Sequence, residues 1–172
     1  MKLYRFSPVE DKEHVLEAIG YVIKQATKLF FNVVGEANCT IEYATLFAHY
    51  NDEYDKIVSV LKMMGELEEA NNGVRVKLSE PLEFSGGSVE VNGEMVNISH
   101  QIKYVRVRKP DPYRMQVGCV DFEEEDYDYF KDLYGMYTRN PRTIEREQYE
   151  MLEFHDPNID VLAYMVSPSL NS

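Results

Sequence analysis

The chain has 172 residues, of which 44% are hydrophobic, and it carries a formal net charge of −12. The hydrophobic fraction excludes a largely disordered chain, and the length suits one domain or two small half-domains that share a core. The negative charge argues against nucleic acid or an anionic membrane as a partner, because like charges repel at long range.

Targeting signals are not evident in the sequence. Residues 1–14 are charged and contain no apolar signal region, and no segment reaches the roughly 18 apolar residues of a membrane span. Cys39 and Cys119 are the two cysteines, and without a secretory signal they indicate free thiols in a reducing compartment. We therefore expect a cytoplasmic protein.

The first predicted element is a long amphipathic helix from about Pro8 to Val33. Ser7 can cap its start, Pro8 suits the first helical position, and Glu10 has the spacing of a capping box. Apolar residues recur at helical spacing as far as Val33, and Gly35 is a typical stop signal.

A strand, a helix and three strands are predicted next. Thr40–Tyr50 is rich in β-branched and aromatic residues, which favour a buried strand. The following helix can be capped by Asn51 or Asp52 and should end at Gly65. Residues 65–73 form a predicted polar loop. Strand-like runs then cover residues 74–84, 88–98 and 101–109, with a turn signal at Asn92-Gly93.

The same order of elements then repeats in a shorter form. A strand is predicted over residues 115–123, a short helix ends at Gly135, and strand-like runs cover residues 143–148, 149–155 and 160–166. A repeated order of elements indicates two related modules. We predict an α+β fold with two βαβββ modules in one compact domain: residues 1–36 form the N-terminal helix, 37–110 the first module and 111–168 the second.

Two stretches of the second module resemble a known superfamily. They are VDFEEEDYDYFKDLYG (residues 120–135) and MLEFHDPNIDVLAY (residues 151–164). With the module order, they resemble the vicinal oxygen chelate superfamily, which includes glyoxalase, extradiol dioxygenases, and fosfomycin and bleomycin resistance proteins. The residues that fit its closing hairpin, F-x-D-P-D-G-N-x-L-E-L, are Phe154, Asp156, Pro157, Val161 and Leu162. The resemblance implies that the two modules curve into a cup-like mixed sheet.

The resemblance also implies where metal ligands would lie, on the first and last strands of each module. These positions fall on Thr45, on Tyr104 or Arg106, on Cys119 and on Ala163. Such sites use histidine and carboxylate ligands and need about three of them. Alanine offers no ligand and arginine repels a cation. We therefore expect neither a metal nor another cofactor.

Strand alternation predicts which side chains line the cup. Val105 and Val107 should pack under a helix, so Tyr104, Arg106 and Arg108 should face the cup. Two arginines on one face suit recognition of a carboxylate or phosphate. The alternative is that they pair with the protein's own acids, for which the candidates are Asp121, Glu123 and Glu153.

Other residues of the same strands complete the candidate site. His49 and His155 are predicted ligand-binding residues, together with Tyr104, Arg106 and Arg108; their alternative is a surface position beside a turn. The catalytic candidates are Cys119, Asp121 and Glu153. For Cys119 the alternative is a buried, inert thiol.

Three functions are compatible with these predictions. The preferred hypothesis is a metal-free, glyoxalase-like cytosolic protein that binds a small polar or anionic ligand. One alternative is a lyase or isomerase that uses Cys119, Asp121 or Glu153. Another is an acidic protein–protein interaction module. A homodimer is compatible with each hypothesis.

Overall fold

The computed structural model describes residue 6 and residues 9–35, 39–135 and 140–167. These parts of the chain form three helices and one eight-stranded sheet. None of the described helices combines the length and apolar character that crossing a bilayer requires. After α1 (Lys12–Val34), the first module contains β1 (Thr40–Phe47), α2 (Asn51–Lys62), β2 (Gly65–Ala70), β3 (Gly73–Val91) and β4 (Glu94–Arg108). The second contains β5 (Gly118–Glu123), α3 (Tyr127–Tyr134), β6 (Arg142–Glu145), β7 (Glu150–Phe154) and β8 (Val161–Val166).

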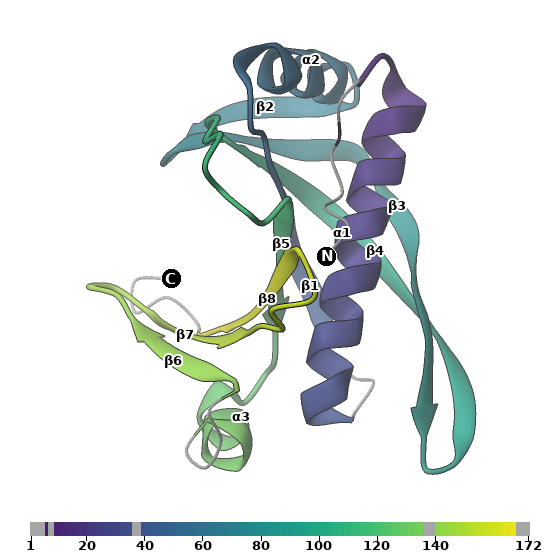
Figure 1. Ribbon diagram of the computed structural model, residues 1–172, viewed down its shortest axis with the longest axis vertical. Coiled ribbons are helices and arrows are strands. Elements are labelled where there is room, and N and C mark those ends of the chain that lie inside the picture. The colour runs from purple at the N-terminus through teal and green to yellow at the C-terminus, as the bar shows by residue number, and fades with distance from the viewer. Residues whose placement is uncertain (1–5, 7–8, 36–38, 136–139, 168–172) are drawn as a thin grey trace.

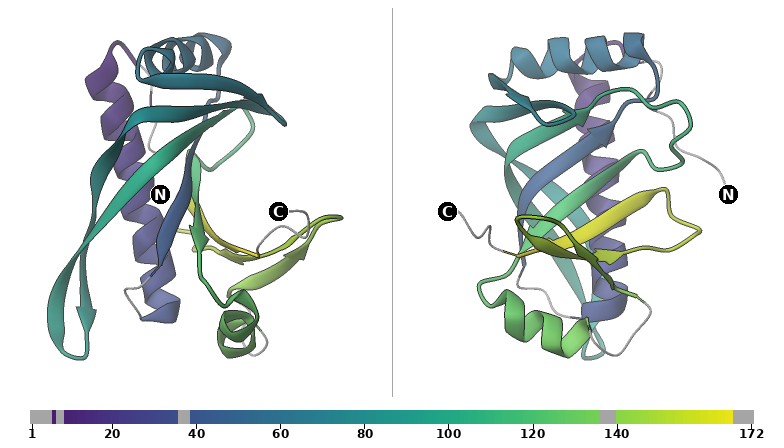
Figure 2. Two further views of the ribbon diagram at one scale, coloured as in Figure 1. Left: turned by 180° about the vertical axis from the view of Figure 1, so that it is seen from behind. Right: turned by 90° about the vertical axis from the view of Figure 1, so that its left-hand side faces the viewer.

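Both modules pair their strands in the same way. The first strand of each lies parallel to the last, β1 with β4 and β5 with β8, and the other pairs within a module are antiparallel. An antiparallel pair between β1 and β5 joins the modules into one sheet with the order β2-β3-β4-β1-β5-β8-β7-β6. The sheet curves, as Figures 1 and 2 show. The predicted α+β fold of two βαβββ modules with a long N-terminal helix is confirmed.

The long helix α1 packs across the convex face of this sheet (Figures 1 and 2). It begins at Lys12, later than predicted, because the Asp11 side chain accepts a hydrogen bond from the His14 amide and caps the helix. The predicted cap at Ser7 and Pro8 lies outside the described residues. The helix ends at Val34 and is followed by Gly35, whose φ of 68° is favourable for glycine.

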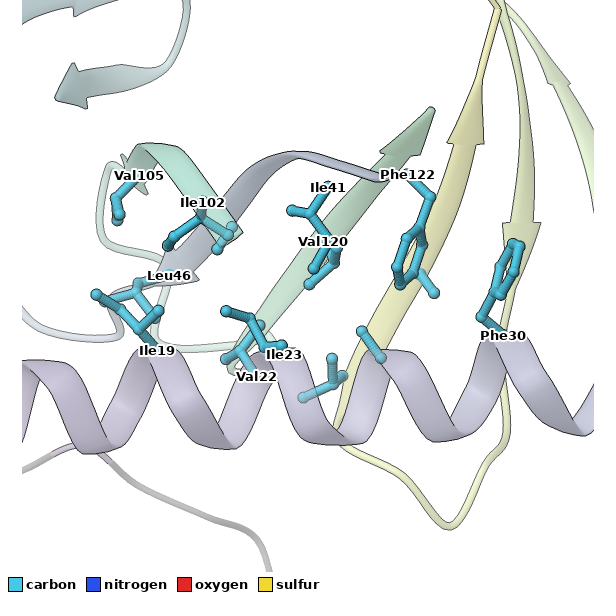
Figure 3. Close-up of a cluster of buried hydrophobic side chains, with 14 of the residues drawn as sticks. Ile19, Val22, Ile23, Phe30, Ile41, Leu46, Ile102, Val105, Val120 and Phe122 are labelled. Atoms are coloured by element: carbon cyan, nitrogen blue, oxygen red, sulfur yellow. The ribbon is translucent and has the colours of Figure 1, made fainter. Parts of the chain in front are cut away.

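The hydrophobic core fills the space between α1 and the sheet. The apolar side chains of α1 repeat at helical spacing and reach the inward side chains of the central strands. Figure 3 shows this contact, with Ile19, Val22, Ile23 and Phe30 directed from the helix toward Leu46, Ile102, Val120 and Phe122 of the sheet. Because α1 covers the convex face, the concave face is left for polar side chains.

Two local predictions of strand and loop were wrong. Residues 65–70 were expected in a polar loop, but they form the edge strand β2, which pairs with β3. Charged residues suit an exposed edge because they discourage pairing with another chain. The three strands expected between residues 74 and 109 are two long strands, and Asn92-Gly93 forms the turn between them with φ angles of 52° and 84°.

Candidate functional site

The side chains of β4 alternate between the two faces of the sheet. Val105 and Val107 are buried in the core, whereas Arg106 and Arg108 are partly exposed on the opposite, concave face. Tyr104 shares the concave face, and its ring centroid lies 5.6 Å from that of Tyr43 on β1. The predicted arginine pair therefore lies on the side away from α1.

Two rows of residues cross the middle of the concave face. The strand registers place Arg106 beside Thr45, and Thr45 beside Cys119. In the second row they place Tyr104, Tyr43, Asp121 and Tyr164 in sequence. The rows bring together residues from both modules, because β1 and β5 are neighbours. Positions that lie far apart in the sequence thus form one surface.

This surface is hollowed. A cavity of about 210 Å³ is lined by residues that include Thr45, Arg106, Arg108, Cys119 and Asp121. A wider cavity of about 1070 Å³ adjoins it. The two share Asn71, Arg106, Asp121, Tyr149 and Met151 in their linings. Together they form one continuous concave site, which we call the hollow.

The described arginines divide into two groups around the smaller cavity. Arg106, Arg108 and Arg146 line it, and within the described residues none of the three has a carboxylate oxygen within 4.0 Å. The other described arginines lie outside its lining and each forms an ion pair: Arg75 with Glu68, Arg114 with Asp111 at 3.7 Å, and Arg142 with Glu153 at 2.7 Å. Neither Arg106 nor Arg108 therefore forms the close ion pair with Asp121, Glu123 or Glu153 that the alternative predicted, although the charges of both act on Asp121.

An aromatic ring lies against the guanidinium of each of the two β4 arginines. The Arg106 guanidinium lies 5.2 Å from the Tyr43 ring centroid, and the Arg108 guanidinium lies 5.3 Å from that of Phe47. Cation–π contacts orient a guanidinium without occupying its N–H donors. Both arginines consequently keep donors for a ligand.

Asp121 is an acidic group beside these arginines. Its partial burial raises the pKa of its carboxyl to about 6, although the charges of Arg106 and Arg108 oppose that shift. The Cys119 thiol lies 4.0 Å from an Asp121 carboxylate oxygen. Asp121 thus has a pKa suited to accepting a proton near neutral pH.

The other two catalytic candidates have less suitable surroundings. Burial, with the negative charge of Asp121, raises the pKa of the Cys119 thiol well above its usual range, and a neutral thiol is a poor nucleophile. Glu153 is buried, pairs with Arg142 at 2.7 Å and accepts a hydrogen bond of 2.9 Å from Tyr164. These contacts occupy Glu153 as a bridge between strands of the second module.

The two predicted histidines do not line the hollow. His49 is buried, not at the surface; its amide donates to Glu53 at 2.5 Å and its Nε2 lies 3.0 Å from the Arg114 carbonyl oxygen. His155 is exposed, and the Asn140 side chain donates to its carbonyl oxygen at 2.9 Å. Neither histidine is among the residues that line the hollow.

The residues at the implied metal-ligand positions do not fit a divalent metal. The implied ligand position on β4 fell on Tyr104 or Arg106. Arg106 is the residue of the two that pairs with Thr45 in the sheet. Ala163 is fully buried on the core face, and the position predicted there was wrong by one residue: Tyr164 faces the hollow instead. A guanidinium repels a cation, and a phenol whose pKa burial raises is a weak ligand. Within the described residues, no group of three or more His, Cys, Asp or Glu side chains is placed to hold a metal ion.

Some residues of the hollow were not among the predicted site residues. Tyr43 shares the face of Thr45 by strand alternation, so the pattern in TIEYATLF contained the signal. Glu42 lines the wider cavity, where burial and the nearby Glu123 raise its pKa to about 7. Arg146 belongs to the turn between β6 and β7, where side-chain direction follows no period and the sequence held no signal.

Comparison with known proteins shows the fold alone. No family model and no curated protein match the chain. A solved structure described as "Structural Genomics, Protein EC4020" matches with a TM-score of 0.60 at 15% sequence identity, over 96% of this chain and 93% of that one. The chain therefore shares its overall architecture with that protein.

Proposed function

We propose that this protein, with the architecture of the vicinal oxygen chelate superfamily, binds a small anionic molecule in the hollow and needs no metal to do so. Arg106 and Arg108 would hold the anionic group. The predicted ligand-binding residue Tyr104 shares their face of the sheet but does not line the hollow. The two-module cup supports the superfamily part of this proposal, and the residues at the implied ligand positions support its metal-free part.

The observation that carries the proposal is the division of the arginines. The chain has 30 acidic residues and 18 basic ones, so a guanidinium has many potential partners. Arg75, Arg114 and Arg142 each form an ion pair with a carboxylate, whereas the arginines that line the hollow form none with the described residues. Arg146 is exposed, but Arg106 and Arg108 are partly buried, and a partly buried cation without an ion pair is costly. A bound anion would supply the ion pair.

Binding can be tested by calorimetric titration with acetate, malonate and inorganic phosphate. For the anion that binds most tightly, Arg106→Gln and Arg108→Gln are each expected to weaken the affinity about 10- to 100-fold, because a hydrogen bond to a charged group is worth about 1.5–3 kcal/mol. Lys56→Gln removes one positive charge from the exposed surface of α2, outside the hollow, and should change the affinity less than about twofold. The proposal fails if none of the three anions binds, or if the Arg106 and Arg108 variants bind as tightly as the parent.

A second candidate function is catalysis of a proton transfer, by a lyase or isomerase in which Asp121 acts as the base. Its position in both parts of the hollow and its raised pKa favour it over Cys119 and Glu153. The ligand held by Arg106 and Arg108 would then lie beside the carboxyl that removes its proton.

The pKa of Asp121 is open to direct measurement. A carbon-detected NMR titration of its carboxyl is expected to give a midpoint near pH 6. In Arg106→Gln the midpoint should rise further, since the Arg106 charge lowers this pKa. A midpoint of about 4, the ordinary value for an aspartate, would contradict the proton-transfer function. So would a midpoint that is the same in the parent protein and in Arg106→Gln.

We also propose a cytoplasmic location, which the two buried free thiols support. The homodimer and the interaction module stay predictions of the sequence.

A further inference from the structure

We propose that Arg146 completes a three-guanidinium site with Arg106 and Arg108, and that the group bound there is a phosphoryl group. The inference rests on the proposed function of the hollow and deepens it in two ways. It adds a binding residue from the second module, and it narrows the ligand from small anions in general to phosphorylated small molecules.

Arg146 approaches the cavity from a different side than the other two arginines. It lies in the turn after β6, whereas Arg106 and Arg108 both project from β4. Its amide donates to the Tyr149 carbonyl oxygen at 2.9 Å, which fixes the backbone of this turn. Tyr149 lines the same cavity. The three cations therefore come from both modules and from two sides of one cavity.

The number of cations bears on the charge of the ligand. A single guanidinium can satisfy a planar carboxylate through two parallel hydrogen bonds. A phosphoryl group carries a charge of about −1.5 to −2 near neutral pH and presents three acceptor oxygens in different directions. Three unpaired guanidiniums around about 210 Å³ match that charge and that geometry better than they match one carboxylate.

The remaining lining of the cavity is compatible with such a group. The Thr45 hydroxyl and the Cys119 thiol are neutral; in the sheet Thr45 lies beside Arg106, and Cys119 lies on the other side of Thr45. Asp121 is the single acid among the described residues that line the smaller cavity. The adjoining cavity of about 1070 Å³ leaves room for the rest of a phosphorylated molecule. Its lining includes Glu42, Glu123, Glu124 and Glu125, so that part of the ligand should be neutral or cationic.

The decisive experiment is a set of calorimetric titrations at about pH 8 with inorganic phosphate, malonate and acetate. The parent protein is expected to bind phosphate more tightly than either carboxylate. Arg146→Gln should weaken phosphate binding about tenfold, equivalent to about 1.4 kcal/mol, and acetate binding by less than about twofold. Arg146→Lys should recover part of the loss because it restores the charge. Lys56→Gln, which removes one positive charge away from the hollow, is the control and should bind phosphate like the parent.

The outcomes separate this inference from the proposed function. If Arg106→Gln and Arg108→Gln weaken anion binding but Arg146→Gln does not, the three-guanidinium site is wrong and the proposed function stands. Tighter binding of malonate than of phosphate would assign the site to dicarboxylates and overturn the phosphoryl assignment. If no anion binds the parent protein, the proposed function fails, and this inference fails with it.

Discussion

Replacement of Phe30 by alanine is expected to lower the free energy of unfolding by about 3–5 kcal/mol. Phe30 is 1% exposed and lies where α1 meets the second module. Its ring centroid lies 4.7 Å from Phe122, 5.2 Å from Phe154, 5.9 Å from Phe130 and 5.8 Å from Phe31. Alanine would leave a cavity among four rings that belong to three other elements and to α1 itself, and such a cavity cannot collapse without moving a strand.

This loss is large because a domain is stable by only about 5–15 kcal/mol in total. Urea denaturation followed by circular dichroism measures it directly. Tyr113→Ala is the matched control: it also removes an aromatic ring, but Tyr113 is 93% exposed, so its effect should stay within about 0.5 kcal/mol. A loss of less than about 1 kcal/mol for Phe30→Ala would show that α1 does not pack on the second module as described.

A pH-dependent loss of stability is expected from His100, which attaches β4 to α1. His100 is 5% exposed, and burial lowers its pKa from 6.5 to about 4. The Thr27 hydroxyl donates to the Ile23 carbonyl oxygen at 2.7 Å, so the neutral ring can donate from Nε2 to the Thr27 oxygen at 3.0 Å. Protonation would place a charge in this buried contact.

The sign follows from the two pKa values. Between about pH 6.5 and pH 4 the unfolded chain binds a proton at His100 that the folded chain does not, so stability falls as the pH falls through this window. At about 1.36 kcal/mol per pH unit, the loss approaches about 3 kcal/mol at pH 4. Above about pH 6.5 this contribution is fully present.

The contribution of His100 is isolated by comparison with His100→Gln, which cannot titrate. Asp121 and Glu42 have raised pKa values and produce the opposite slope, but they are present in both proteins and cancel in the difference. Chemical denaturation of both proteins at a series of pH values should show the parent losing its advantage as the pH falls from about 6.5 to 4. A difference that does not change with pH would contradict the buried, neutral state of His100.

Strand alternation explains why much of the concave face was predictable. Val105 and Val107 had to reach the core, so Arg106 and Arg108 had to face away from it. The position that the resemblance implied at Ala163 was wrong, because Ala163 is buried on the core face and its neighbour Tyr164 lines the hollow. A local sequence pattern determines the face of a strand residue only when the register of that strand is known.

Features that depend on tertiary contacts were not predictable. Residues 65–70 become a strand because β3 offers them backbone partners, although their acidic side chains resemble those of a loop. Arg146 reaches the hollow through the turn between β6 and β7. The absence of a carboxylate partner for Arg106 and Arg108, noted above for the described residues, depends on where the acids of both modules lie in space.

The central claim is that the unpaired arginines of the hollow hold an anion. A crystal structure of the protein with inorganic phosphate tests it most directly. We expect phosphate oxygens at about 2.7–2.9 Å from the guanidinium nitrogens of Arg106 and Arg108, in the cavity beside Thr45 and Cys119. A structure in which the cavity contains no phosphate, and in which Arg106 and Arg108 form ion pairs with carboxylates of the protein itself, would contradict the claim.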